Sequence, residues 1–269
     1  MSRAARGDDR ADALLARHAL ALNRGRTAAA LDAVQALAED RSRAAFATRL
    51  EVTDFLYGRG DSTAAARAAE RLTRLLESSS HRVLPPGQSA EVASNACVVR
   101  QWRLWSHATA PLDSAMTLLL RGAASRDSSA GELCTALADA IEATGARTPD
   151  ASQRAAHLDS LVQSGARDDE LASYVGLALA RAYVALGDNR RALDAVRRRP
   201  YMRRWPHYLA AHLELEGKVA EAIGDSAGAA DAYARYLTLR SDPDAAFRGE
   251  VADVRAALAR LSERPDSSR

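Results

Sequence analysis

Apolar residues along this chain recur at the three- and four-residue spacing of amphipathic helices, in stretches closed by Gly, Asn, Ser, Asp or Pro. The stretches come in pairs separated by short turns. The expected helices lie at residues 12–24, 27–39, 42–57, 62–77, 90–106, 112–123, 130–144, 149–164, 170–186, 190–199, 206–223, 227–240 and 244–261. We therefore expect an all-α chain of about twelve or thirteen helices, most of them paired as helical hairpins.

The turns inside these pairs follow one pattern. Gly187 and Gly224 end the first helix of two pairs, and an Asp follows each of them. Glycine readily adopts the left-handed conformation that ends a helix, and Asp caps the helix that follows. Gly25 and Gly60 occupy the same place in two N-terminal pairs. The spacing between these glycines, 35 residues in the N-terminal half and 37 in the C-terminal half, predicts a helical-repeat solenoid.

A small residue follows each turn glycine at a constant distance, which allows the second helix to cross the first closely. The four positions, five residues after the glycine, are Ala30, Ala65, Ala192 and Ala229. Gly217 adds a small residue in the first helix of its pair, and Tyr233 adds an aromatic residue in the second. This register resembles the tetratricopeptide repeat family. The match is good for residues 171–200 and 209–243, weaker in the N-terminal pairs and poor between them.

The resemblance implies a right-handed superhelical α-solenoid, in which the unpaired and highly charged last helix acts as a cap. Arrays of this family bind peptides, chain tails or other subunits in a concave groove and are generally not catalysts. We expect one continuous solenoid with internal divisions. These are N-terminal helix pairs at 1–77, a Pro/Ser-rich loop at 78–88, degenerate pairs at 89–165, repeats at 166–243, and a capping helix with a tail at 244–269.

Composition and charge narrow the classes of function. Aromatic residues make up 5% of the chain and alanine is abundant, which favours helix over sheet. The 37 basic and 35 acidic residues give a net charge of +2, so a nucleic-acid partner is not expected. Lys218 is the only lysine, as is typical of a high-GC bacterial genome.

No segment has the pattern of a secretory signal or a membrane span. The charged start is not followed by an apolar run, and the longest uncharged run, residues 171–180, is about half the length needed to cross a bilayer. We expect a cytoplasmic protein without a transmembrane segment, which leaves peripheral docking on a membrane complex open.

Familiar catalytic and metal motifs are not found in the sequence. HExxH, GxSxG, GxGxxG and EF-hand patterns do not occur. His207 and His212 are five residues apart, a spacing that does not suit two zinc ligands on one helical face. Cys97 and Cys134 form no CxxC pair and are interpreted as buried thiols in a reducing compartment. We expect no metal, no cofactor and no enzymatic activity.

Two segments are candidates for binding a partner. The first places cations beside aromatic rings around a helix break, at Arg198, Arg199, Tyr201, Arg203, Arg204 and Trp205. Such a group can grip an acidic peptide, a phosphate or a nucleic acid; alternatively its rings are core contacts and its arginines are solvated. In the second segment Trp102 and Trp105 share a helical face and Arg103 lies on another. These tryptophans are either core residues or partner anchors.

The sequence therefore favours a non-catalytic scaffold for protein–protein interaction. The first hypothesis is an accessory, extrinsic subunit that fastens components of a larger assembly, for which the cytoplasmic face of a bioenergetic or photosynthetic membrane complex is one conceivable host. The alternative is a regulatory adaptor that binds a peptide transiently. A stable subunit should keep large apolar contacts, whereas a transient module should present a polar groove.

Overall fold

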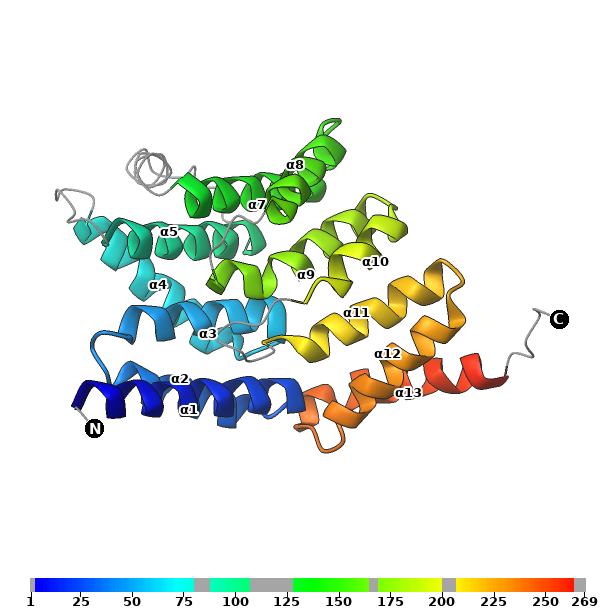
Figure 1. Ribbon diagram of the computed structural model, residues 1–269, viewed down its shortest axis with the longest axis horizontal. Coiled ribbons are helices and arrows are strands. Elements are labelled where there is room, and N and C mark those ends of the chain that lie inside the picture. The colour runs from blue at the N-terminus through cyan, green and yellow to red at the C-terminus, as the bar shows by residue number, and fades with distance from the viewer. Residues whose placement is uncertain (1–2, 80–87, 107–127, 165–168, 200–206, 264–269) are drawn as a thin grey trace.

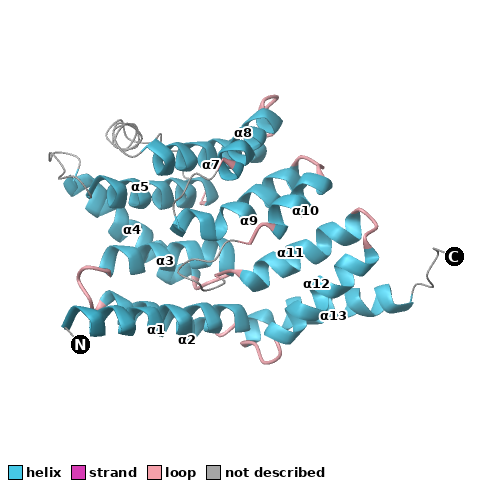
Figure 2. Ribbon diagram, in the orientation of Figure 1, coloured by secondary structure: helices cyan, strands magenta, loops and turns pink. Residues whose placement is uncertain are grey.

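The computed structural model describes residues 3–79, 88–106, 128–164, 169–199 and 207–263, which form helices joined by turns and contain no strand (Figure 2). The helices are α1 (Arg3–Arg24), α2 (Thr27–Ala38), α3 (Ala44–Gly58), α4 (Ser62–Ser79), α5 (Gln88–Trp105), α7 (Ser128–Ala146), α8 (Ala151–Gln163), α9 (Asp169–Ala185), α10 (Asn189–Arg197), α11 (Leu209–Ala222), α12 (Ser226–Leu239), the 3-10 helix η1 (Ala245–Phe247) and α13 (Arg248–Glu263). The predicted all-α class is confirmed.

The observed helix boundaries differ most from the predicted ones at the N-terminus. Helix α1 begins at Arg3 instead of residue 12, because the alanine and arginine residues before position 12 have high helix propensity, which continues the helix past Gly7. The expected helix at 112–123 lies outside the described residues, as does most of the expected loop at 78–88.

Three turns between paired helices share the predicted backbone form. Gly25, Gly187 and Gly224 have φ angles of 73°, 76° and 82°. In each turn the residue after the glycine donates its N–H back to the last turn of the helix; the N–H of Asp188 lies 2.9 Å from the carbonyl oxygen of Tyr183. These hydrogen bonds satisfy carbonyl groups that a helix end otherwise leaves unpaired.

In two other turns an arginine, and not a glycine, adopts the left-handed conformation that ends the helix. In the α3–α4 turn Arg59 adopts the left-handed conformation, with φ of 59°, and Gly60 does not. Gly60 instead lies against α3, where an added Cβ would come within 3.0 Å of Asp54 Cβ. In the α7–α8 turn Arg147 ends the helix with φ of 53°. The sequence pattern misses both, because non-glycine residues reach this conformation only at a cost that the tertiary packing must offset.

The small residues of the repeat register lie where helices approach closely. The four alanines that follow the turns, each at most 2% exposed, are Ala30, Ala65, Ala192 and Ala229. Gly217 of α11 faces the ring of Tyr233 of α12 so closely that an added Cβ would lie 2.3 Å from Tyr233 Cε1. Small residues at these places therefore allow the second helix of each pair to pack against the first.

The helices pack in sequence order, and the path turns back on itself. In Figure 1 the chain rises from α1 and α2 to α7 and α8 and returns through α9 to α12 beside its starting point. The first helices of the pairs contact one another along this path, and α11 also contacts α1 and α3. Helix α13 packs on α12 at the end of the array. The helix contacts thus form a closed circuit.

A specific set of polar contacts joins the first hairpin turn to the loop before α13. Asp244 donates its backbone N–H to the carbonyl of Gly25 at 3.0 Å. Its carboxylate accepts the backbone N–H of Thr27 at 2.8 Å and the hydroxyl of the same residue at 3.1 Å. Beside them Arg26 forms an ion pair with Asp242. The start of α2 is therefore capped by a residue from the other end of the chain.

Aromatic side chains fill the centre of the circuit. Tyr57 of α3 stacks on Tyr174 of α9 with 4.5 Å between ring centroids, and Tyr208, at the start of α11, lies 6.1 Å from Tyr57. All three are buried. The surface that would line an open groove is here occupied by the protein's own side chains. Among the described helices, none combines the length and apolar character needed to cross a bilayer.

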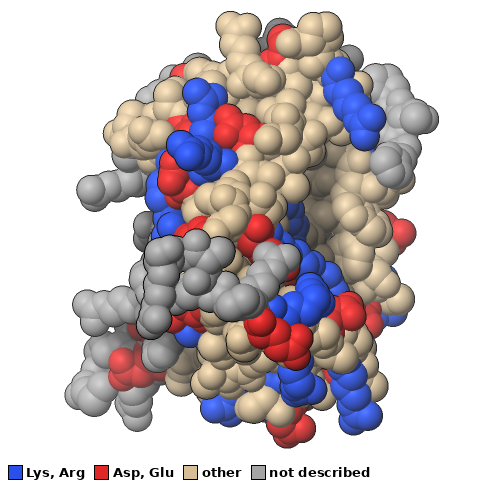
Figure 3. Space-filling model, turned by 90° about the vertical axis from the view of Figure 1, so that its right-hand side faces the viewer, with Lys and Arg blue, Asp and Glu red and all other residues tan. Residues whose placement is uncertain are grey.

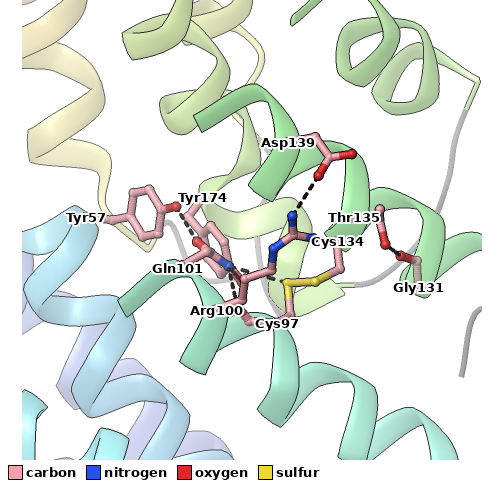
Figure 4. The surroundings of a disulfide bond; sticks show 9 residues. All are labelled: Tyr57, Cys97, Arg100, Gln101, Gly131, Cys134, Thr135, Asp139 and Tyr174. Carbon is pink, nitrogen blue, oxygen red and sulfur yellow. Dashed lines mark hydrogen bonds and ion pairs between the residues drawn. A yellow bond between two sulfur atoms is a disulfide. The ribbon is translucent and has the colours of Figure 1, made fainter. Parts of the chain in front are cut away.

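Cys97 of α5 and Cys134 of α7 form a disulfide bond, with 5.6 Å between their Cα atoms (Figure 4). Both residues are buried. The expectation of two separate thiols is therefore wrong. The two cysteines are 37 residues apart and meet because α5 and α7 pack side by side, which neither local pattern indicates.

Candidate binding pocket

Three aromatic side chains gather where α3 and α5 end. Phe55 makes an edge contact with Trp105, with 4.6 Å between ring centroids, and another with Trp102 at 5.7 Å. The two tryptophans are themselves 5.2 Å apart. Trp105 remains 50% exposed although its residue type is usually well covered. A half-exposed tryptophan held by two other rings is a rigid apolar surface that solvent still reaches.

Trp105 borders a half-open pocket of about 280 Å³, which we call the Trp105 pocket. Its walls are the C-terminal halves of α3, α5, α7 and α9. The lining residues are Leu56, Tyr57, Gln101, Leu104, Trp105, Ile141, Thr144, Gly145, Ala178, Arg181, Ala182 and Ala185. Small-molecule and cofactor sites occupy about 300 to 1,000 Å³. The Trp105 pocket lies at the lower end of this range, a size that suits a single large side chain.

A buried hydrogen-bond network holds the floor of this pocket. The Tyr57 hydroxyl donates to Gln101 Oε1 at 2.5 Å, and Gln101 Nε2 lies 3.4 Å from the Tyr174 hydroxyl and from Cys97 Sγ (Figure 4). Burial raises the pKa of Tyr57, so its hydroxyl keeps its proton at physiological pH. The floor is thus polar but internally satisfied, and the disulfide lies directly behind it.

Arg181 supplies the positive charge of the pocket. Its Nη1 donates to the carbonyl oxygen of Leu56 at 2.8 Å, and its guanidinium lies over the ring of Tyr57, 5.6 Å from the centroid. The surrounding helices partly desolvate the guanidinium, which lowers the pKa of Arg181, although the side chain still reaches solvent. Within the described part of the chain, no carboxylate lies at ion-pair distance from it. Arg181 therefore contributes a cation, with further N–H donors, to a mainly apolar hollow.

The other residues of the predicted tryptophan segment face a second hollow. Trp102 is partly buried, and with Arg103 it lines a shallow depression of about 450 Å³ between α4 and α5. The neighbouring Arg100 pairs with Asp139 of α7 at 2.7 Å. The structure thus brings Trp102 and Trp105 into contact while each borders a different hollow, so they do not form a single binding face.

The arginine-rich segment is described only in part. Arg198 pairs with Asp159 of α8 at 2.6 Å, and Arg199 pairs with Glu216 of α11, which also accepts a hydrogen bond from Arg197 at 2.9 Å. These arginines connect neighbouring helices and are engaged with carboxylates of the protein itself. The remaining candidates lie outside the described residues, namely Tyr201, Arg203, Arg204 and Trp205.

Charged residues on the face shown in Figure 3 are mixed rather than segregated. Basic and acidic side chains alternate below a hollow that is bordered by uncharged residues. One charged depression, of about 430 Å³, lies between α11 and α13, where Arg59 pairs with Glu250 and with Glu214 at 3.8 Å. No large area of one sign is seen on this face, so it does not favour nucleic acid.

The buried histidines are arranged for packing. His18 Nε2 lies 2.7 Å from Asp54 Oδ2, and Asp54 Oδ1 is 3.2 Å from the Tyr208 hydroxyl. The ring of His207 lies 5.4 Å from that of His18. All four residues are buried. The described residues contain no group of three or more His, Cys, Asp or Glu side chains suited to a metal ion.

Comparison with known proteins gives no relative. No protein-family model, curated protein or solved structure matches this chain. The resemblance to tetratricopeptide repeats therefore rests on the residue register alone.

Sequence reasoning identified Trp105 and missed its partners. Tyr57 and Gln101 lie in unremarkable helical patterns and become part of the site only because α3, α5 and α9 converge. Arg181 does carry a signal, since it ends the longest uncharged run of the chain at residues 171–180. A cation that follows such a run is placed beside buried surface, which is where the structure puts it.

Proposed function

We propose that this chain is a non-catalytic protein-interaction module, built from helical hairpins, that binds a segment of a partner protein in the Trp105 pocket. The observation that carries the proposal is Trp105 itself, half exposed beside an apolar pocket. Burial of a tryptophan is among the largest single contributions to binding at protein interfaces. A tetratricopeptide-like superhelical solenoid is the architecture we propose for the array, and the hairpin register supports it.

The arrangement of titratable groups supports a role without catalysis. The His18–Asp54 pair, which has the composition of an acid–base dyad, is enclosed and hydrogen-bonded to Tyr208. A catalytic pair must reach a substrate. In the Trp105 pocket the polar groups are an amide, hydroxyls and an arginine, which suit recognition more than proton transfer.

The described surface favours a transient adaptor over a permanently attached subunit. The exposed large apolar residues of the described part lie on, or directly after, different helices and are Leu20, Leu75, Trp105, Val184 and Ile223. Permanent interfaces resemble a divided core and bury large apolar areas. We therefore propose that the protein is a regulatory adaptor that binds a peptide transiently. The alternative role, as an accessory subunit of a membrane complex, is the one that the test below must distinguish from it.

The disulfide bears on the compartment. Disulfides persist in oxidising compartments and are rare in the cytosol. The expected cytoplasmic location relied in part on free thiols, and the disulfide removes that support. We propose that the working form of the protein is the disulfide-bonded one.

Selection from a library of random peptides displayed on phage tests the function. The wild-type protein should enrich a family of apolar peptides whose binding is lost in Trp105→Ala. Leu75→Ala is the matched control, since Leu75 is also exposed and lies outside the Trp105 pocket. Recovery of no peptide that depends on Trp105 would contradict the proposal. Elution of the native protein at fixed stoichiometry within a large complex would favour the accessory subunit instead.

A further inference from the structure

The Trp105 pocket contains one group that an apolar ligand cannot satisfy. Arg181 is accessible to solvent, and among the residues that the structure describes only its Nη1 has a hydrogen bond, to Leu56 O. A ligand that fills the pocket displaces water from the remaining N–H groups. Desolvating a charged donor without replacing its hydrogen bonds is costly. The occupant must therefore bring an acceptor to Arg181.

The other polar groups of the lining already have hydrogen-bond partners within the protein, so Arg181 is the group that needs an acceptor from the ligand. Gln101 is engaged with Tyr57 and Tyr174. The Thr144 hydroxyl donates within its own helix, at 2.7 Å from the carbonyl oxygen of Ala140. A planar guanidinium pairs best with a carboxylate, which supplies both acceptor oxygens and the opposite charge.

The C-terminal ends of α3, α5, α7 and α9 also contribute a partial negative charge here. Their effect is limited because hydrogen bonds already satisfy many of these carbonyls, among them Leu56 O with Arg181 and Ala143 O with the N–H of Thr148. In the described part of the chain no carboxylate lies at ion-pair distance from Arg181, so its positive charge is the principal unbalanced charge of the pocket.

Resting on the proposed function, we propose that the partner segment carries a large apolar residue next to an internal Asp or Glu, with the apolar side chain against Trp105 and the carboxylate on Arg181. The apolar side chain matches the lining of α5, α7 and α9. We propose an internal segment because the pocket is half-open, so that a side chain can enter it from a chain that lies outside.

The test measures fluorescence anisotropy with short labelled peptides that are acetylated and amidated at their ends. The central dipeptide is Phe-Glu, Phe-Gln, Phe-Lys or Ala-Glu, and a fifth peptide ends in Phe with a free carboxylate. Phe-Glu should bind the wild-type protein at least about tenfold more tightly than Phe-Gln, the difference typical of a charge-assisted hydrogen bond. Ala-Glu should bind weakly, because it leaves the apolar pocket empty.

Protein variants assign this preference to Arg181. Arg181→Gln should bind Phe-Glu and Phe-Gln equally, while retaining wild-type affinity for Phe-Gln, which also shows that the pocket is folded. The control is Arg191→Gln. Arg191 lies over the ring of Tyr183 as Arg181 lies over Tyr57, but outside the pocket, so its loss should leave the Phe-Glu preference unchanged.

The outcomes separate this inference from the proposed function. Equal binding of Phe-Glu and Phe-Gln, or tighter binding of Phe-Lys, would overturn the inference, and dependence on Trp105 would still support the function. Preference for the free carboxylate end would overturn the internal position of the acid. If none of these peptides binds, the inference fails, and the proposed function is then judged by the phage selection alone. If the peptides from that selection bind equally well to Trp105→Ala, the proposed function fails too.

Discussion

The Asp244 carboxylate caps the start of α2, 2.8 Å from the backbone N–H of Thr27 and 217 residues away in the chain. At the equivalent place in three other pairs the cap is local: Asp61, Asp188 and Asp225 each accept the N–H of the residue three positions later. In the first pair that position holds Arg26, which cannot accept a hydrogen bond. The missing local cap is thus replaced by a contact that also joins the two ends of the array.

Removal of this distant cap should destabilise the whole fold. Asp244→Ala leaves the Thr27 N–H unsatisfied and weakens the contact between the ends, so we expect the free energy of unfolding in urea to fall by about 1 to 2 kcal/mol. Asp242→Ala is the control: its ion pair with Arg26 is exposed, and the expected loss is below about 0.5 kcal/mol. Equal effects of the two substitutions would show that the cap does not join the ends.

Gly217 should tolerate no added methyl group. An added Cβ would lie 2.3 Å from the Tyr233 ring, so Gly217→Ala should reduce the free energy of unfolding by about 1 to 3 kcal/mol. Gly249→Ala in α13 meets nothing within 4 Å and should stabilise the protein by up to about 1 kcal/mol, because alanine favours helix. The double variant Gly217→Ala/Tyr233→Ala should lose less than the sum of its single losses. Additive losses would refute the contact.

The disulfide should make a large contribution to stability. A bond that closes a loop of 37 residues reduces the entropy of the unfolded chain by an amount equivalent to about 4 kcal/mol. The double variant Cys97→Ala/Cys134→Ala should lose about this free energy of unfolding, and dithiothreitol should destabilise the wild type but not the variant. Alkylation of the native protein after denaturation without reductant should label no thiol. Two labelled thiols would contradict both the bond and the working form proposed above.

His212 should make stability depend on pH. Burial, together with the positive charges of Arg199 and Arg181, lowers the pKa of His212 to about 3. The unfolded chain binds the proton near pH 6.5 and the folded chain does not, so stability is retained above pH 6.5 and falls as the pH decreases toward 3. Between pH 6.5 and pH 5 this group should lower the free energy of unfolding by about 1 to 2 kcal/mol.

The variant His212→Leu isolates that dependence. Neither ring nitrogen of His212 has a hydrogen-bond partner among the described residues, so leucine should be accepted without loss of a hydrogen bond. Urea unfolding curves at pH 6.5 and pH 5 should show a smaller decrease in stability for the variant than for the wild type. An identical decrease would assign the pH dependence to other groups.

Much of the local structure follows from sequence, and much of the pocket does not. The Gly187-Asp188 turn is predictable because glycine and aspartate act within a few residues of their own position. Trp105 could be proposed as an anchor from its residue type. Tyr57 and Gln101 could not, since they reach the pocket only through the convergence of several helices.

The sequence by itself determined the helices, their pairing into hairpins and the small residues at their crossings, because each depends on neighbours within about one or two turns of helix. Only the tertiary structure decided which distant residues meet: Cys97 with Cys134, Thr27 with Asp244, and Arg181 with the pocket beside Trp105. The physical reason is geometric. The packing of successive helices on one another, which no local pattern contains, places the first hairpin turn of this chain against the loop before α13.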